Sequence, residues 1–166
     1  MVNEVREPII IGTLRRYLAD PDATARAGAA LAPGLRGGMI VTLSGELGSG
    51  KTTLVRGMLR ALGWTGPVKS PSFALVEHYQ FSSLYFYHFD FYRFEDPEAW
   101  DSTGFAEYFR PDAVAVVEWP ERVKGRLPPA DVALSLEHAE PGRRLELRAG
   151  TPAGDACLHG FAAVMP

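Results

Sequence analysis

The segment MIVTLSGELGSGKTTLVRGMLRAL, residues 39–62, constrains the fold more than any other part of the chain. It starts with a continuous apolar run, MIVTL, which has the length and composition of a strand buried on both faces. It ends with apolar residues three to four positions apart, which predicts a helix with one buried face. Between the two lies a loop with glycine at positions 45, 48 and 50, where the absence of a Cβ allows a tight turn. A buried strand that turns directly into a helix predicts an α/β fold.

The loop itself, GELGSGKT, has the spacing G-x-x-x-x-G-K-[ST] of a phosphate-binding loop. Its backbone amides can approach a phosphate, and the positive end of the next helix lies at the same point. Lys51 is expected to reach the β and γ phosphates of ATP, and the Thr52 hydroxyl to bind Mg²⁺. The predicted ATP contacts are Glu46, Leu47, Gly48, Ser49, Gly50, Lys51, Thr52 and Thr53. A plain glycine-rich turn is the alternative, but both flanks match and lysine is rare among the 17 basic residues.

The rest of the chain alternates strands and helices. Strands are expected near residues 13–19, 70–81, 84–93 and 113–118, helices at 20–34 and 97–109, and a hairpin at 131–138 and 143–149. We therefore predict an α/β fold of the P-loop NTPase type, with a mixed, mainly parallel sheet flanked by helices and a C-terminal antiparallel hairpin. No repeat or linker divides the chain, so residues 1–150 are expected to form one domain. The tail at residues 151–166 has no predicted structure.

A phosphate loop needs a carboxylate near its Mg²⁺, and two apolar strands of this chain end in one. The run AVAVVE ends in Glu118, and the run LYFYHFD ends in Asp90. Because the carboxyl ends of parallel strands meet at one edge of a sheet, both acids are expected to reach the phosphates. AVAVVE suits the centre of the sheet, so Glu118 is predicted to hold Mg²⁺ and Asp90 to orient the attacking water or help hold the metal. The opposite assignment stays open, and so does a helix-capping role for either acid.

Two further features lie close to these residues in the sequence. KSPSF follows the predicted loop helix, and the hydroxyls of Ser70 and Ser72 suit a switch segment that senses the γ phosphate. An ordinary proline-containing connection explains this segment equally well. His88 shares a face with Asp90 if the strand is regular. It either hydrogen-bonds near the site or, as is more common for a buried histidine, belongs to the core.

Composition excludes several classes of protein. The net charge of −3 and the pI near 5.8 argue against a broad basic surface for nucleic acid or anionic membrane. Cys157 is the single cysteine, which excludes an internal disulfide and fits a reducing cytoplasm. No apolar run approaches the roughly 20 residues of a membrane span, and the start, MVNEVREPIIIG, has too short a hydrophobic stretch for a secretory signal. We expect a cytoplasmic protein.

The motifs GELGSGKTT, VKSPSFALVE, YHFDFYR, GFAEYF and VVEWP resemble, in order and spacing, those of the TsaE (YjeE) family of small bacterial ATPases. The likeness covers roughly residues 20–147. It implies a P-loop fold with a mixed sheet and ATP hydrolysis, together with action beside TsaB and TsaD in making threonylcarbamoyladenosine on tRNA. The family usually has threonine at Ser72, aspartate at Glu46 and alanine at Ser49. Ser72 keeps the hydroxyl, so the switch role survives with a less restricted side chain.

The same resemblance implies roles for single residues. Thr52 and Glu118 would hold Mg²⁺, and Asp90 would be an essential acid. Asp20 and Thr24 match positions close to the adenine end of the nucleotide, although a helix cap is the simpler explanation for them.

These observations predict a Mg²⁺-dependent ATPase with Lys51, Asp90 and Glu118 as its catalytic residues. Its expected partner is the TsaB–TsaD heterodimer, whose complex it would reset between cycles. Hydrolysis is expected to be slow in isolation and stimulated by partners, because no arginine finger is evident. Two other classes share the loop: a P-loop small-molecule kinase, which needs an acceptor site and an arginine-bearing lid, and a nucleotide-gated binding module without catalysis.

Overall fold

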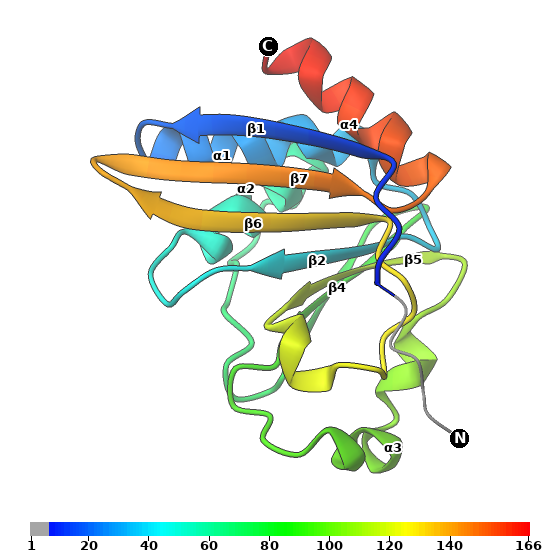
Figure 1. The fold of residues 1–166 in the computed structure, drawn as a ribbon. Coiled ribbons are helices and arrows are strands. Elements are labelled where there is room, and N and C mark those ends of the chain that lie inside the picture. Colours follow the sequence, from blue (N-terminus) through cyan, green and yellow to red (C-terminus); the bar gives the residue numbers. More distant parts are fainter. Residues whose placement is uncertain (1–6) are drawn as a thin grey trace.

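A seven-stranded sheet in the order β1-β7-β6-β2-β5-β4-β3 forms the centre of the computed structural model (Figure 1), which describes residues 7–166. Residues 1–6, where the predicted domain and the N-terminal stretch begin, lie outside the described residues. The strands are β1 (Gly12–Leu18), β2 (Ile40–Ser44), β3 (Val76–Gln80), β4 (Tyr85–Asp90), β5 (Ala113–Glu118), β6 (Val132–Ala139) and β7 (Gly142–Ala149). Strands β6, β2, β5 and β4 pair in parallel, whereas β7 and β3 pair antiparallel with their neighbours. The mixed sheet and the β6–β7 hairpin are confirmed, with three parallel and three antiparallel pairings.

Three helices cover one face of this sheet; in Figure 1, two of them lie behind the upper strands and the C-terminal one rises above them. They are α1 (Pro21–Leu31), which continues into the short turn η1 (Ala32–Gly34), α2 (Lys51–Ala61) and α4 (Pro152–Val164). Apolar side chains from all three helices join those of β2, β6 and β7 in one buried cluster. None of the helices within residues 7–166 is long and apolar enough to span a bilayer.

The tail at residues 151–166, for which the sequence predicted no structure, forms α4. Thr151 caps this helix by accepting a hydrogen bond from the Gly154 amide at 3.1 Å. Its hydroxyl also donates to Asp131 at 2.6 Å, which fixes the start of the helix beside β6. Cys157, Leu158 and Phe161 are buried against the sheet, so the tail completes the core.

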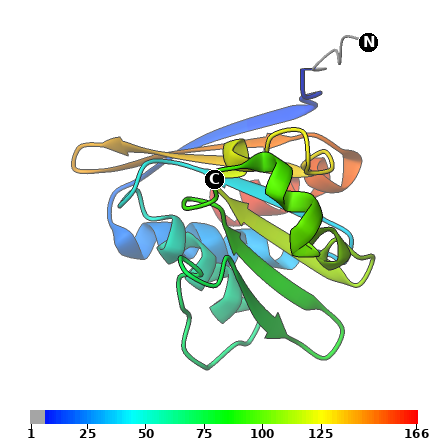
Figure 2. The same cartoon turned by 90° about the horizontal axis from the view of Figure 1, so that it is seen from below.

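The opposite face is covered over β4 and β5 by short helical turns, which lie in front of the sheet in Figure 2. These are η2 (Pro97–Ala99), α3 (Trp100–Thr103), η3 (Phe105–Tyr108) and η4 (Pro120–Val123). Their aromatic residues pack on Phe89 and Phe91 in a second buried cluster. The helical character expected at residues 97–109 is present, but as three short pieces: Gly104 adopts φ +76° and ends α3 after four residues.

Alternation along β4 and β5 decides which side chains face α2. Tyr87 and Phe89 belong to the second buried cluster, on the side of α3. Phe86 belongs to the first cluster, on the side of α1, α2 and α4. Successive strand residues point to opposite faces, so His88 and Asp90 lie on the α2 side with Phe86. The same parity on β5 places Glu118 on the α2 side, which brings the two acids to the face that carries the glycine-rich loop.

Candidate nucleotide-binding site

The glycine-rich loop connects the end of β2 to the start of α2. Gly48 and Gly50 have φ values of +76° and +103°, a left-handed conformation that favours glycine. The Ser49 amide closes the turn by donating to the Glu46 carbonyl at 3.1 Å, and the Leu54 amide donates to the Gly50 carbonyl at 3.0 Å. The amides of the first turn of α2 have no intrahelical acceptor, so they and the helix dipole suit an anion.

Lys51, the first residue of α2, is buried with its ammonium folded back on the loop. Nζ donates to the carbonyls of Gly45 at 2.5 Å and Glu46 at 2.9 Å, and lies 4.9 Å from the centre of the Trp119 ring. Burial lowers the pKa of Lys51, and the nearby carboxylates of Glu118 and Asp90 oppose that change. The ammonium is thus surrounded by neutral acceptors and an aromatic face, with carboxylates at longer range.

Asp90 and Glu118 are neighbours at the carboxyl ends of β4 and β5. They occupy paired positions in the parallel register, and both are buried, at 8% and 2% exposure. Burial raises the pKa of Asp90, and the Glu118 carboxylate adds to this effect, whereas the Tyr92 amide, which donates to Asp90 at 3.0 Å, lowers it. Two buried carboxylates side by side form a strongly negative spot that suits a divalent cation.

His88 belongs both to the core and to the surroundings of the site. Its ring is completely buried, and Nε2 lies 2.5 Å from a carboxylate oxygen of Glu118. Nδ1 has no hydrogen-bond partner among the described residues. With its hydrogen on Nε2, the ring donates to this oxygen, which a carboxylate accepts. His88 therefore holds one oxygen of Glu118 in place.

The loop, the acids and part of the predicted switch segment line one cleft of about 310 Å³. Its lining residues are Leu47, Gly48, Gly50, Lys51, Thr52, Thr53, Ser70, Asp90, Glu118 and Trp119. Thr52, Asp90 and Glu118 supply hard oxygen donors, which is the set that Mg²⁺ prefers, and a nucleotide bound to the loop would complete the coordination with phosphate oxygens. The residues present therefore fit a magnesium ion beside a phosphate group.

Several predicted residues lie outside this cleft. Glu46 lines a neighbouring hollow that shares Trp119 with the cleft, and Ser49, within the loop, is buried with no partner for its hydroxyl among the described residues. Asp20 is the N-cap of α1, accepting from the Ala23 amide at 2.8 Å, as the simpler explanation predicted. Thr24 is buried one turn later, and its Cγ2 lies about 3.5 Å from where a side chain at Gly50 would begin. Thr24 thus supports the loop from below.

The segment after α2 departs from the extended conformation that was predicted. Residues 72–75 form a turn in which the Leu75 amide donates to the Pro71 carbonyl at 2.9 Å, and Leu75 has φ +67°. The strand starts at Val76. Ser70 lines the cleft, whereas Ser72 is half-buried and does not. The reason for the difference is Pro71, whose buried ring begins a turn that a regular strand cannot contain.

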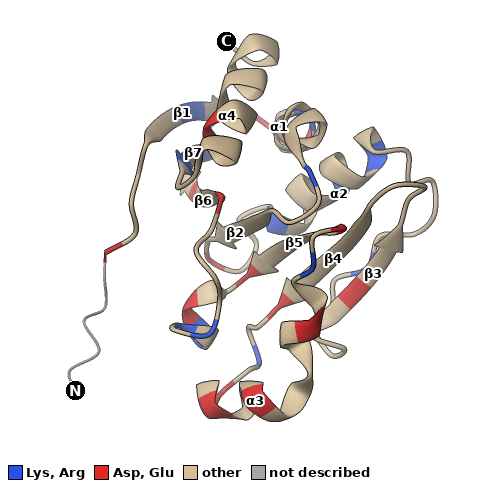
Figure 3. Ribbon diagram, turned by 90° about the vertical axis from the view of Figure 1, so that its right-hand side faces the viewer, with Lys and Arg blue, Asp and Glu red and all other residues tan. Residues whose placement is uncertain are grey.

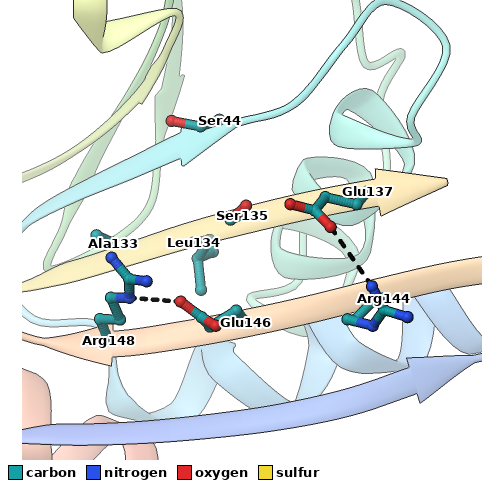
Figure 4. A pocket seen from close by; sticks show the side chains of 8 residues that line it. All are labelled: Ser44, Ala133, Leu134, Ser135, Glu137, Arg144, Glu146 and Arg148. Carbon is teal, nitrogen blue, oxygen red and sulfur yellow. Dashed lines mark ion pairs between the residues drawn. The ribbon is translucent and has the colours of Figure 1, made fainter. Parts of the chain in front are cut away.

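A second hollow, of about 320 Å³, lies on the open face of the sheet over β6 and β7 (Figure 4). Its charged residues pair with one another: Arg144 with Glu137 at 3.6 Å, and Arg148 with Glu146. None of the residues predicted to bind nucleotide or metal lines this hollow. Its charges are already satisfied, so the cleft at the loop is the better candidate site.

One residue beside the loop was not predicted from the sequence. Arg143, on β7, donates to the carbonyls of Ser49 at 2.9 Å and Gly48 at 3.2 Å. In the sequence it is one of several arginines in an alternating hairpin, and no local pattern distinguishes it from Arg144. The pairing of β7 with β6 and β1 brings it to the loop.

Comparison with known proteins decides the family. The family model described as "Threonylcarbamoyl adenosine biosynthesis protein TsaE" matches residues 18–145, which include the whole candidate site. The chain belongs to the TsaE family. It is similar to the tRNA threonylcarbamoyladenosine biosynthesis protein TsaE of Haemophilus influenzae, with 42% identity over 123 residues that cover 74% of this chain and 78% of the relative. The TsaE protein of Bacillus subtilis is 34% identical over 131 residues, covering 79% of this chain and 82% of that one.

The fold agrees with this membership in the TsaE family. The crystal structure of YdiB from Bacillus subtilis matches with a TM-score of 0.80 and 25% identity, over 93% of this chain and 97% of that one. The resemblance to TsaE and the P-loop fold expected from the sequence are both confirmed. The region matched by the TsaE model ends within β7, so the whole of α4 lies beyond it.

Proposed function

We propose that this chain is a Mg²⁺-dependent ATPase that acts in the threonylcarbamoyladenosine modification of tRNA. The observation that carries the proposal is the convergence of Lys51, Thr52, Asp90 and Glu118 on one cleft at the start of α2. A loop and helix terminus that bind phosphate, beside two buried acids, are the parts required for phosphoryl transfer to water. Membership in the TsaE family and the names of its relatives support the biological process.

Each group has a separate role in the proposed reaction. The loop amides and Lys51 bind the β and γ phosphates and stabilise the charge that develops on the transferred group. Thr52 and Glu118 hold Mg²⁺, and His88 orients the Glu118 carboxylate. Asp90 accepts a hydrogen bond from the attacking water. In the alternative assignment, Asp90 binds the metal and Glu118 orients the water. When bound, Mg²⁺ would supply positive charge that offsets the negative charge of the phosphates.

The catalytic part is tested by three single substitutions and one control. Lys51→Ala is expected to weaken ATP binding, whereas Asp90→Asn and Glu118→Gln are expected to keep ATP binding and lose turnover by about 10²-fold or more. Glu121→Gln, which removes an exposed acid close enough to influence Lys51, is the control and should retain activity. Binding is measured by calorimetry and turnover by phosphate release. Tight ATP binding by the unaltered chain without phosphate release above that of Lys51→Ala would instead support a nucleotide-gated binding module.

The proposed partner is the TsaB–TsaD heterodimer, and hydrolysis would reset its complex between cycles. Two of the exposed large apolar side chains, Leu47 at 62% and Phe73 at 84%, belong to the loop and to the predicted switch segment. A partner that buried them would contact the segments that sense the nucleotide. The acidic turns around α3 (Figure 3) do not suit a large direct contact with tRNA. The proposal keeps the cytoplasmic setting expected from the sequence.

Partner stimulation is tested by single-turnover hydrolysis with and without TsaB–TsaD. The rate is expected to rise with the partner, and Phe73→Ser should reduce this rise while leaving the rate of the isolated chain unchanged. Equal rates with and without the partner would refute stimulation without affecting the catalytic assignment.

A further inference from the structure

The guanidinium of Arg143 donates three hydrogen bonds, all of them to main-chain carbonyls. Nε donates to Ser49 at 2.9 Å, one terminal nitrogen donates to Gly48 at 3.2 Å, and the other donates to Gly142 at 2.9 Å. No carboxylate pairs with it among residues 7–166. Arg143 is half-buried, has no acidic partner and donates to two consecutive carbonyls of one loop. An arginine that only increases the solubility of the surface does not need this geometry.

These two carbonyls set the direction of two peptide units in the phosphate loop. In each peptide unit the C=O and the following N–H point in opposite directions. In the first peptide unit, Arg143 binds the Gly48 carbonyl, and the Ser49 amide on the other side donates to Glu46. In the second, Arg143 binds the Ser49 carbonyl, so the Gly50 amide points away from Arg143. Arg143 therefore hydrogen-bonds the loop on its outer side. The Gly50 amide points to the inner side, where a phosphate would bind.

Gly48 and Gly50 supply no side chain that could restrain their part of the loop. Gly48 has no atom within 4 Å of the place of a Cβ, and both Gly48 and Gly50 have positive φ. Glycine has the largest choice of backbone conformations, so several arrangements of these peptide units have similar energy without an external contact. The contact comes from β7, which is paired with β6 and β1 and is therefore rigid.

We propose that Arg143 is a positioning residue for phosphate binding, because it holds the Gly48 and Ser49 carbonyls so that the loop amides are already arranged for the phosphates. The inference rests on the proposed ATPase function and adds a residue to it. Arg143 acts through the loop and touches no reacting atom. It selects the binding-competent loop from the conformations that the glycines allow.

This role predicts a specific kinetic pattern. If the competent loop is one of several conformations, the apparent dissociation constant equals the intrinsic one divided by the competent fraction. Once nucleotide is bound, the phosphates themselves hold the loop. Arg143→Gln should therefore raise Kd and KM for ATP by about 10- to 100-fold, the range expected for losing hydrogen bonds from a charged donor. The kcat at saturating MgATP should stay within about twofold. The Kd for ADP should rise by the same factor, because ADP also places a phosphate in the loop.

The matched control is the adjacent residue. Arg144 is exposed on the opposite face of the hairpin, where it pairs with Glu137 (Figure 4). Arg144→Gln removes the same charge at nearly the same place in the chain and should leave Kd, KM and kcat unchanged. Arg143→Lys keeps the charge but lacks the planar fork, so it should recover only part of the lost affinity. It also keeps the test available if Arg143→Gln does not fold.

The experiment measures ATP and ADP binding by calorimetry, steady-state hydrolysis, and the NMR signals of the Gly48, Ser49 and Gly50 amides without nucleotide. We expect those signals to move or broaden in Arg143→Gln and to stay in place in Arg144→Gln. Unchanged amides together with unchanged Kd in Arg143→Gln would overturn the inference. Full rescue by Arg143→Lys would also overturn it, because charge alone would then suffice. If the unaltered chain fails to bind ATP, the proposed function falls, and the amide signals still decide whether Arg143 orders the loop.

Discussion

Gly57→Ala is expected to destabilise the protein, although alanine is the better helix former. Gly57 lies in α2 at its contact with α1, where an added Cβ would sit 2.1 Å from the Ala25 carbonyl oxygen. Ordinary contact begins at 3.4 Å, so the two helices must separate by roughly 1.3 Å. The atoms in the way are backbone, so no change of side-chain rotamer relieves the clash.

Two opposing effects decide the magnitude. The substitution gains up to about 1 kcal/mol from helix propensity. Overpacking costs about 1 to 3 kcal/mol, and a backbone clash belongs at or above the upper end of that range. The expected net loss is about 2 kcal/mol in the free energy of unfolding, which for a chain of this length lowers Tm by about 4 to 8 °C. The same separation moves the first turn of α2, so ATP binding should weaken as well.

Gly160→Ala is the matched control for this substitution. Gly160 also lies within a helix, α4, but has nothing within 4 Å of the place of a Cβ. It should gain about 0.5 to 1 kcal/mol from propensity alone. Urea unfolding and thermal melting of both variants provide the comparison. If Gly57→Ala matched or exceeded the stability of Gly160→Ala, the close α1–α2 contact and the reasoning built on it would be refuted.

Three further predictions concern buried polar groups. Burial raises the pKa of Asp90, so its ionised form lowers the stability of the protein at neutral pH. Asp90→Asn should therefore raise the free energy of unfolding at pH 7, measured by urea titration in EDTA without nucleotide. This gain should vanish at acid pH, where the wild-type carboxyl takes up its proton. A less stable Asp90→Asn would contradict this. Ser49→Ala removes a buried hydroxyl without a described partner and should stabilise the protein by about 1 kcal/mol in urea unfolding, whereas a loss would reveal a hidden hydrogen bond. Burial raises the pKa of Cys157 to about 11, so alkylation at pH 8 should follow unfolding; rapid labelling of the folded chain would disprove its burial.

The amino-acid sequence by itself determined the strand–loop–helix unit and the fold class. A glycine-rich loop, a lysine and two apolar flanks are contiguous, so local spacing predicts their geometry. The adjacency of Asp90 and Glu118 was also predictable, because each ends an apolar strand and the carboxyl ends of parallel strands share an edge. The local pattern failed at Gly104 and Pro71. At each position a single residue interrupts an element that the sequence pattern predicted to be continuous.

The tertiary structure alone decided which distant side chains complete the site. His88 meets Glu118 across 30 residues, and Arg143 meets Ser49 across 94. The sequence also did not predict that residues 151–166 dock as α4 onto the core. The physical reason is that a sheet joins residues through the order and register of its strands, which depend on the whole chain. An arginine in a hairpin has the same sequence neighbours whether it points into solvent or hydrogen-bonds to a loop. Only the fold determines which of the two it does.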